Sequence, residues 1–364
     1  MHRRSFLQAI AASLSLSATA AFHPARAEET FDLTIASSHP TTLAWVEMMS
    51  KFFAPEVNKR LAASGKYKIN WREAYGGQLY KQNATLTSVE QGITDIGWVW
   101  TQQEAAKMPL ANVATVTPFT TDQLPIILEV MNELAETQAA VQAEWDKNNM
   151  VFLGATGVDS YHLFTKSPIS AYADLNGKKI GAPGALGLWL RNSGAVPVDG
   201  SLVTFYTDIQ SGVSEGAVSI ATGILAAKVY EVAPYVTTVN IGALCVGALA
   251  INKDTFNALP PEVQQVLKDV GKEYTRREGE EIMRRAETAL VKMQEAGARQ
   301  AVPVQIAALP PAERDQWIRT MPNLAAEWVK NNEAKGLPAK RILAAYMDGL
   351  RKRGVKPARD WDQE

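Results

Sequence analysis

The chain has 364 residues, and its 37 lysines and arginines are balanced by 38 aspartates and glutamates, which gives a formal net charge of −1 at pH 7. A near-neutral chain with interspersed charges offers no extended basic surface, which argues against nucleic acid or an anionic membrane as a partner. Hydrophobic residues make up 46% of the chain, a globular level that argues against disorder.

The first 27 residues have the pattern of an export signal. Arg3 and Arg4 form a twin-arginine pattern, an apolar stretch covers residues 9–21, and the small residues Ala25 and Ala27 frame a cleavage position. The apolar stretch is shorter than the ~20 residues that span a bilayer. We therefore expect cleavage after Ala27, a periplasmic location and no membrane insertion of the mature chain.

The residues after this segment alternate between strand and helix patterns. Strands are predicted at residues 31–37, 67–75, 95–100 and 151–156, and helices at 41–57, 83–91 and 126–147. This alternation predicts βαβ units with parallel strands, whose right-handed crossovers bring the loops after the strands to one edge.

The same rhythm continues through the second half of the chain. Turn, strand, helix, strand and helix follow one another between Asp174 and Gly216, with a short strand at 178–180 and a helix from Thr204 to Gly212. Next come a strand at 242–252, a long charged helix at 262–296, and two further helical regions, of which the last ends near Arg353.

These elements predict a two-lobed α/β fold with a central cleft, because the chain passes between two α/β units more than once. The expected parts are a first lobe (28–157), a second lobe (158–243), a return to the first lobe with the long helix (244–285), and C-terminal helices mostly on the second lobe (286–364). Ligands in such folds bind between the lobes, at the carboxyl edges of the strands.

No motif indicates a catalytic residue, a cofactor or a metal. The mature chain has one cysteine, Cys245, in an apolar run, and two histidines, His39 and His162. It contains no Cys/His cluster with metal spacing, no Gly-x-Ser-x-Gly elbow and no glycine-rich phosphate loop.

The order of several short motifs resembles the solute-binding proteins of tripartite ATP-independent periplasmic (TRAP) transporters, of the C4-dicarboxylate-binding type. The resemblance runs through residues 33–57, GGQL (76–79), QGITDIG (91–97), HLFTKSPI (162–169), 174–216, YEVAPYVTT (230–238) and 251–267. It implies a periplasmic-binding-protein-like fold and an extracytoplasmic subunit that delivers a small organic solute to the TRAP membrane permease, without chemistry of its own.

Two arginines that the family uses are absent. The arginine that clamps a ligand carboxylate in relatives falls on Gly181, and a frequent second arginine falls on Tyr161. A guanidinium suits a carboxylate because it donates two parallel hydrogen bonds. Arg191 is the candidate substitute, and a plain surface charge is the alternative interpretation of this residue.

Aromatic and polar residues complete the predicted solute site. Trp98 and Trp100 lie two apart on a strand and share a face, and with Tyr161 and Trp189 they predict an aromatic wall, against the alternative of core packing. Trp45 is assigned to packing. By matched position in the resemblance, the predicted polar contacts are His39, Gln82 and Ser219, and Thr222 follows one helical turn after Ser219. For His39, a satisfied histidine between the lobes is the alternative interpretation.

The sequence therefore leaves the identity of the solute open. The resemblance favours an organic acid, whereas the missing arginines favour a small amine, an alcohol or an aromatic ligand in the same transport role. A periplasmic α/β enzyme or a ligand sensor is the alternative of another class.

Overall fold

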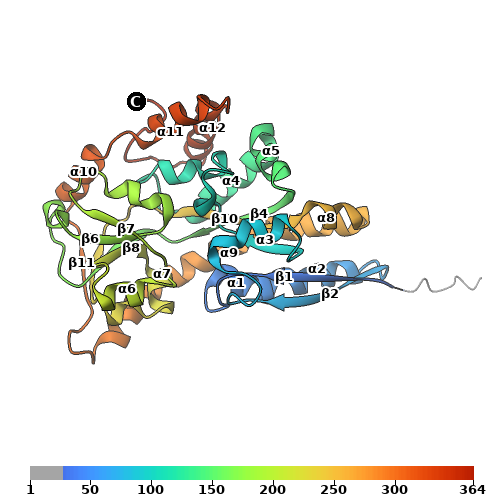
Figure 1. Ribbon diagram of the computed structural model, residues 1–364, viewed down its shortest axis with the longest axis horizontal. Coiled ribbons are helices and arrows are strands. Elements are labelled where there is room, and N and C mark those ends of the chain that lie inside the picture. Colours follow the sequence, from blue (N-terminus) through green and yellow to red (C-terminus); the bar gives the residue numbers. More distant parts are fainter. Residues whose placement is uncertain (1–27) are drawn as a thin grey trace, which may run out of the picture.

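The computed structural model describes residues 28–364 and confirms a two-lobed α/β fold, with one β-sheet in each lobe (Figure 1). The strand order is β2-β1-β3-β10-β4 in the first sheet and β11-β9-β5-β8-β6-β7 in the second. The expected signal segment lies outside the described residues. Within residues 28–364, no helix is both long enough and apolar enough to cross a membrane.

The first sheet is mixed. Its strands are β1 (Glu29–Ala36), β2 (Tyr67–Ala74), β3 (Ile96–Val99), β4 (Met150–Val158) and β10 (Leu244–Asn252). β1 is parallel to β2 and β3, as expected, whereas β10 is antiparallel to both β3 and β4. The βαβαβ part is parallel as predicted, and the returning strand β10 is antiparallel because it enters from the other lobe and not through a helical crossover.

Helices and helical turns cover this sheet. They are α1 (Ala44–Met48), η1 (Met49–Phe53), α2 (Ala54–Ala62), η2 (Gln82–Ala84), α3 (Thr85–Glu90), η3 (Thr101–Glu104), η4 (Leu110–Val116), α4 (Leu124–Thr137), α5 (Ala139–Lys147) and α8 (Lys253–Ala258). The single helix expected at 126–147 is two helices, because Gln138 is extended, with φ −98° and ψ 103°.

The second sheet combines parallel and antiparallel pairs. Its strands are β5 (Tyr161–Thr165), β6 (Lys179–Ala182), β7 (Val196–Asp199), β8 (Gly216–Ile220), β9 (Tyr235–Thr238) and β11 (Gln305–Ala308). β6 is parallel to β7 and β8, while β5 is antiparallel to β8 and β9. The elements around it are η5 (Tyr172–Leu175), η6 (Gly184–Leu190), α6 (Phe205–Ser211), α7 (Ala221–Ala226) and η7 (Val229–Glu231). As expected, α6 ends at Gly212, which adopts φ 82°.

Two crossing segments join the lobes, and they are hydrogen-bonded to each other. The Tyr161 N–H donates to the Gly242 carbonyl at 3.2 Å, and the Ile241 N–H donates to the Tyr161 carbonyl at 3.1 Å. The ladder continues into the first sheet, where Leu244 pairs with Val158. The two crossings therefore form one antiparallel ribbon between the lobes.

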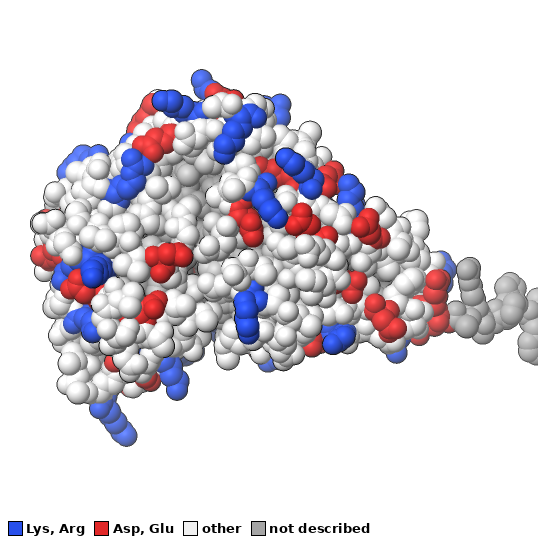
Figure 2. All heavy atoms as spheres, viewed as in Figure 1, with Lys and Arg blue, Asp and Glu red and all other residues white. Residues whose placement is uncertain are grey.

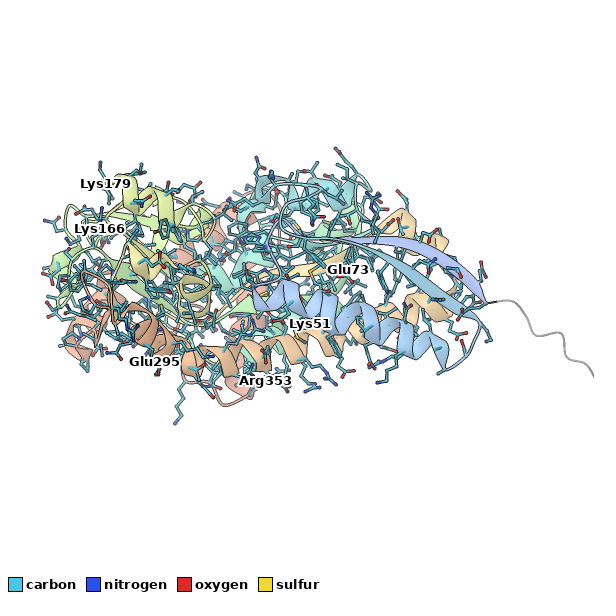
Figure 3. The ribbon with its side chains drawn as sticks, turned by 90° about the horizontal axis from the view of Figure 1, so that it is seen from below. Lys51, Glu73, Lys166, Lys179, Glu295 and Arg353 are labelled. Carbon is cyan, nitrogen blue, oxygen red and sulfur yellow. The ribbon has the colours of Figure 1, made fainter. Side chains whose placement is uncertain are left out.

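The long helix α9 (Pro261–Gly297) is a third link between the lobes. It packs against α2, α4 and β4 of the first lobe and against α7 and β11 of the second. Figure 3 shows it running along both lobes, with Glu295 near one end. Its exposed side carries pairs such as Arg276–Glu280, at 2.6 Å, which is the solvated charged face that the sequence predicts.

The C-terminal helices α10 (Pro311–Thr320), α11 (Leu324–Glu333) and α12 (Ala339–Lys352) divide between the lobes. α10 contacts η5 in the second lobe, whereas α11 and α12 pack against η4, and α12 also packs against α4. The expectation that these helices lie mostly on the second lobe therefore needs correction. Gly349 permits the close approach, because a Cβ there would meet Val130 at 2.8 Å.

Glu278 on α9 is a fully buried carboxyl group near the start of the crossing ribbon. One of its oxygens accepts the Gly157 N–H at 3.2 Å, and its Oε2 has no hydrogen-bond partner. Burial without a counter-charge raises the pKa of Glu278 well above its usual value of 4.5.

We predict that Glu278→Gln raises the free energy of unfolding, and that the gain grows with pH. Above about pH 4.5 the unfolded chain releases the Glu278 proton while the native chain keeps it, so the wild type loses stability as pH rises. The expected gain is near zero at pH 4.5 and increases as the pH is raised toward 8.

Urea unfolding at several pH values measures this gain, with Glu280→Gln on the exposed side of the same helix as the matched control. A Glu278→Gln effect that is the same at all pH values would contradict a native state that holds this proton.

Candidate functional site

A small cavity lies between the lobes, beside the crossing ribbon. Its volume is about 40 Å³, and its lining comes from both lobes: His39, Trp45, Trp98, Trp100, Gln102, Val158, Tyr161, Pro183, Ser201, Leu202, Ser219, Ile220 and Val246. Many of these residues end or follow strands β1, β3, β6, β7 and β8, which is the strand edge where the sequence places a ligand. A water molecule needs about 10–15 Å³ of such space, so a ring-sized solute fits only when the lobes move apart.

Aromatic rings form one wall of the cavity. Trp98 and Trp100 lie on one face, stacked with their centroids 5.9 Å apart. The His39 ring meets them edge-on, at 5.1 Å and 5.7 Å, and Trp45 lies 5.9 Å from Trp98. Trp98 on β3 and Trp100 directly after the strand create this face, and α1 brings Trp45 to it from another part of the chain.

Two of these tryptophans have an internal acceptor. The Trp98 Nε1–H donates to the Thr156 hydroxyl at 2.8 Å, and the Trp100 Nε1–H donates to Gln102 Oε1 at 3.0 Å. The Nε1–H of Trp45 and the Nε2 amide of Gln102 have no partner among the described residues, although both atoms are buried. Two residues of the lining thus carry a buried N–H group that has no acceptor among residues 28–364.

The lining of the cavity carries no lysine, arginine, aspartate or glutamate. Burial lowers the pKa of His39 to about 4, so its imidazole is neutral at pH 7. Its Nδ1 lies 3.0 Å from the Ser38 hydroxyl. The wall therefore presents aromatic surface and neutral polar groups.

Gln82 connects the lobes next to the cavity. Its Oε1 accepts the Ser201 hydroxyl at 3.0 Å, which joins η2 of the first lobe to the loop before α6 of the second. Gln82 is thus placed beside the cavity and is not part of its lining.

Thr222 and Trp189 lie behind the wall. The Thr222 hydroxyl bonds the buried carboxyl group of Asp159, which also accepts the Thr222 N–H at 3.2 Å. Trp189 packs edge-on against Tyr161 at 5.2 Å, and its Nε1–H donates to the Thr115 carbonyl at 2.8 Å. Both residues support the lining from outside.

Gly181 faces the core of the second lobe. A Cβ at this position would lie 2.8 Å from the ring of Phe205, so the space for a side chain at residue 181 is filled by that ring. Arg191 does not replace the missing guanidinium. It forms a bidentate pair with Glu327 on the surface, at 2.6 and 3.1 Å, and is 40% exposed.

The sequence-based reasoning missed several lining residues. Trp45 was assigned to packing, and Gln102, Pro183, Ser201, Leu202 and Val246 were not named at all. A usable signal existed for Trp45, because it follows shortly after His39 in the sequence, at the start of the first helix. Val246 lies on β10, and the other missed residues belong to loops and short helical turns whose positions depend on long-range packing.

Two larger hollows lie on the outside of the described chain. One, of about 530 Å³, lies between α5, β4, α8 and α9, and another, of about 460 Å³, lies on the outer side of the crossing ribbon. The second contains Arg314, which donates to the Val239 and Asn240 carbonyls, and Arg353, which pairs with Glu129 and Glu133. Both arginines are therefore already paired within the protein and do not indicate a ligand site in this hollow. We place the candidate site in the cavity between the lobes.

Charges are interspersed on the face seen in Figure 2, where lysines and arginines alternate with acids without an extended patch of one sign.

Within residues 28–364, no group of three or more His, Cys, Asp or Glu side chains is arranged to hold a metal ion.

The sequence profile of the bacterial extracellular solute-binding proteins, family 7, matches residues 35–332. The chain belongs to this family. Among curated relatives, a solute-binding protein of Sulfitobacter sp. (strain NAS-14.1) is 31% identical over 131 residues, which are 35% of this chain and 39% of the relative. A solute-binding protein of Albidiferax ferrireducens is 25% identical over 61% of this chain and 64% of its own length. The matches thus span less than two thirds of either relative.

Solved structures of TRAP solute-binding proteins share the fold of this family 7 member. A marine metagenome protein specific for aromatic acid ligands, in complex with 3-hydroxybenzoate, has a TM-score of 0.78 at 20% identity, over 89% of this chain and 99% of its own. A protein from Rhodoferax ferrireducens T118 with copurified benzoate has a TM-score of 0.73 at 20% identity, over 89% and 98%. A marine metagenome protein specific for pyroglutamate has a TM-score of 0.72 at 19% identity, over 89% and 99%.

We predict that the imidazole of His39 stays neutral down to about pH 5 in the native protein. Burial holds the pKa of His39 near 4, against 6.5 in an unfolded chain. The native ring is therefore protonated only at a pH more than one unit below that at which the unfolded chain takes up the same proton. Histidine ring NMR with pH titration measures the midpoint, with the urea-unfolded chain as the reference. A native midpoint near 6.5 would mean that the ring is solvated.

Proposed function

We propose that this chain is the extracytoplasmic solute-binding subunit of a TRAP transporter. It captures a small organic solute between its lobes and delivers it to the membrane permease subunits. The observation that carries the proposal is the enclosed aromatic cavity, whose lining comes from both lobes at the crossing ribbon. Membership of family 7 supports the same role.

The shape of the site suits capture by closure. Tyr161 and Val158 belong to the crossing ribbon and also line the cavity, so a rotation of the lobes changes the wall itself. The hydrogen bond between Ser201 and Gln82 then acts as a contact of the closed form. Capture of this kind requires binding and release only, and we propose no catalytic step.

The proposed location is the periplasm, reached through the twin-arginine signal and cleavage after Ala27. Two features support it: the pattern of residues 1–27 and membership of an extracellular solute-binding family. The permease is the proposed protein partner, and it is implied by the family.

Organic acids are the first solutes to test. The structural relatives include proteins with bound benzoate, 3-hydroxybenzoate and pyroglutamate. The aromatic wall of Trp98, Trp100 and Tyr161 suits a flat ring, because aromatic surfaces stack with a planar solute and bury large apolar area. C4-dicarboxylates are expected to bind weakly, since no guanidinium lines the cavity.

A thermal-shift screen of aromatic acids, lactam acids, dicarboxylates, carboxamides, amines and alcohols tests the proposed role. A cognate solute should raise the melting temperature in a concentration-dependent way. It should also reduce the radius of gyration in small-angle scattering, because the lobes close around it. If no solute in the panel stabilises the protein or changes its radius, the proposed role fails.

We predict that Trp100→Ala weakens solute binding about five- to thirty-fold, because a stacking ring in a desolvated pocket contributes ~1–2 kcal/mol. Trp145→Ala is the contrasting variant, since Trp145 is equally buried and lies outside the lining. It should lower the melting temperature with unchanged affinity. Calorimetric titration and melting of both variants measure these effects, and unchanged affinity in Trp100→Ala would assign that ring to packing alone.

A further inference from the structure

Two residues of the cavity lining carry a buried N–H group without an acceptor. Trp45 is 3% exposed and Gln102 is 2% exposed, and both line the cavity. The Nε1–H of Trp45 and the Nε2 amide of Gln102 have no hydrogen-bond partner within residues 28–364. Such groups are costly to leave unpaired in a folded protein.

The orientation of the Gln102 amide is determined by its neighbour. The Trp100 Nε1–H can only donate, so the oxygen of Gln102 must face it, which is the arrangement seen at 3.0 Å. The free end of the amide is therefore the NH₂ group. Like the indole N–H of Trp45, it is a donor without an acceptor among residues 28–364.

The cavity offers no positive charge to accompany that acceptor. Its lining contains no lysine or arginine, and Arg191 pairs with Glu327 on the surface. The buried carboxyl group of Asp159 lies behind the wall, where it bonds Thr222, and burial raises its pKa to about 6. An ionised solute carboxylate would lose its hydration here without an opposite charge in the lining.

We propose that Trp45 and Gln102 hold the acceptor oxygen of the solute through neutral N–H donors, and that the site prefers an uncharged carboxamide or lactam to the matching carboxylate. This inference rests on the proposed function and narrows its solute class. A neutral carbonyl accepts both hydrogen bonds and brings a much smaller desolvation cost than a carboxylate.

Three pairs of probes with matched shape test the preference. They are benzoate and benzamide, 3-hydroxybenzoate and 3-hydroxybenzamide, and pyroglutamate and pyroglutamamide. Calorimetric titration of the mature wild-type protein, at low and at high salt, should give the carboxamide of at least one pair an affinity at least tenfold above that of its acid. The affinity of the carboxamide should not depend on salt, since no ion pair is screened.

Three variants test the assignment of the donors. Trp45→Phe removes the N–H but keeps an aromatic ring, and it should weaken binding of the carboxamide about five- to tenfold. Gln102→Glu keeps an oxygen for Trp100 and replaces the free NH₂ group by an acceptor. It should therefore weaken binding of the carboxamide about tenfold or more. Trp71→Phe is the matched control, because its Nε1–H is also buried without a partner, but Trp71 is not in the lining. Its affinity should equal that of the wild type.

Several outcomes would overturn the inference. Tighter, salt-dependent binding of the acids would show that the site recognises charge. Equal affinities of Trp45→Phe, Gln102→Glu and the wild type would remove these residues from recognition. Absence of binding for all six probes, while another solute of the broader panel binds, would refute the proposed chemical class. If no solute of that panel binds, the proposed function fails, and this inference fails with it.

Discussion

The hydrogen-bonded ribbon between the lobes is the constraint on which the rest of the structure depends. Tyr161 exchanges backbone hydrogen bonds with Ile241 and Gly242, and this pairing fixes both crossings relative to each other. Because Tyr161 also lines the cavity, the hinge and the binding wall share a residue. α9 packs along both lobes and adds a third link between them, so the proposed closure is a rotation of the lobes about these links.

The cavity between the lobes combines aromatic area with neutral polar groups. Its tryptophans use part of their hydrogen-bonding capacity inside the wall, through Thr156 and Gln102, which fixes the orientation of the rings. His39 is kept neutral by burial, so its ring adds polar edges without charge. A wall of this kind discriminates by shape and by hydrogen bonding, because it has no charge with which to attract an ion at long range.

The sequence predicts those parts of the fold and of the site that depend on local patterns. The alternation of strands and helices predicts two lobes, and the two-residue spacing of Trp98 and Trp100 predicts their shared face. Contacts between segments that are far apart in the sequence could not be predicted from these local patterns. Thr222 is occupied by Asp159 and Arg191 by Glu327, and neither pairing has a signature in the sequence.

The position of Gly181 illustrates the same limit. The sequence shows that a side chain is missing there, but it does not show what fills the space. The structure places the ring of Phe205 against Gly181, so lobe packing replaces a polar group at this point. α1 carries Trp45 into the cavity wall, where its ring lies 6.0 Å from that of His39. The packing of Phe205 against Gly181 depends on tertiary structure that single-sequence patterns do not encode.

The most direct test of this account is a crystal structure of the mature protein with the solute that copurifies with it. The account predicts electron density for the solute between the lobes, in contact with Trp100 on one side and Tyr161 on the other, with its acceptor oxygen within hydrogen-bond distance of Trp45 Nε1 and Gln102 Nε2. A solute bound instead in the hollow on the outer side of the ribbon, against Arg314 and Lys356, would contradict it.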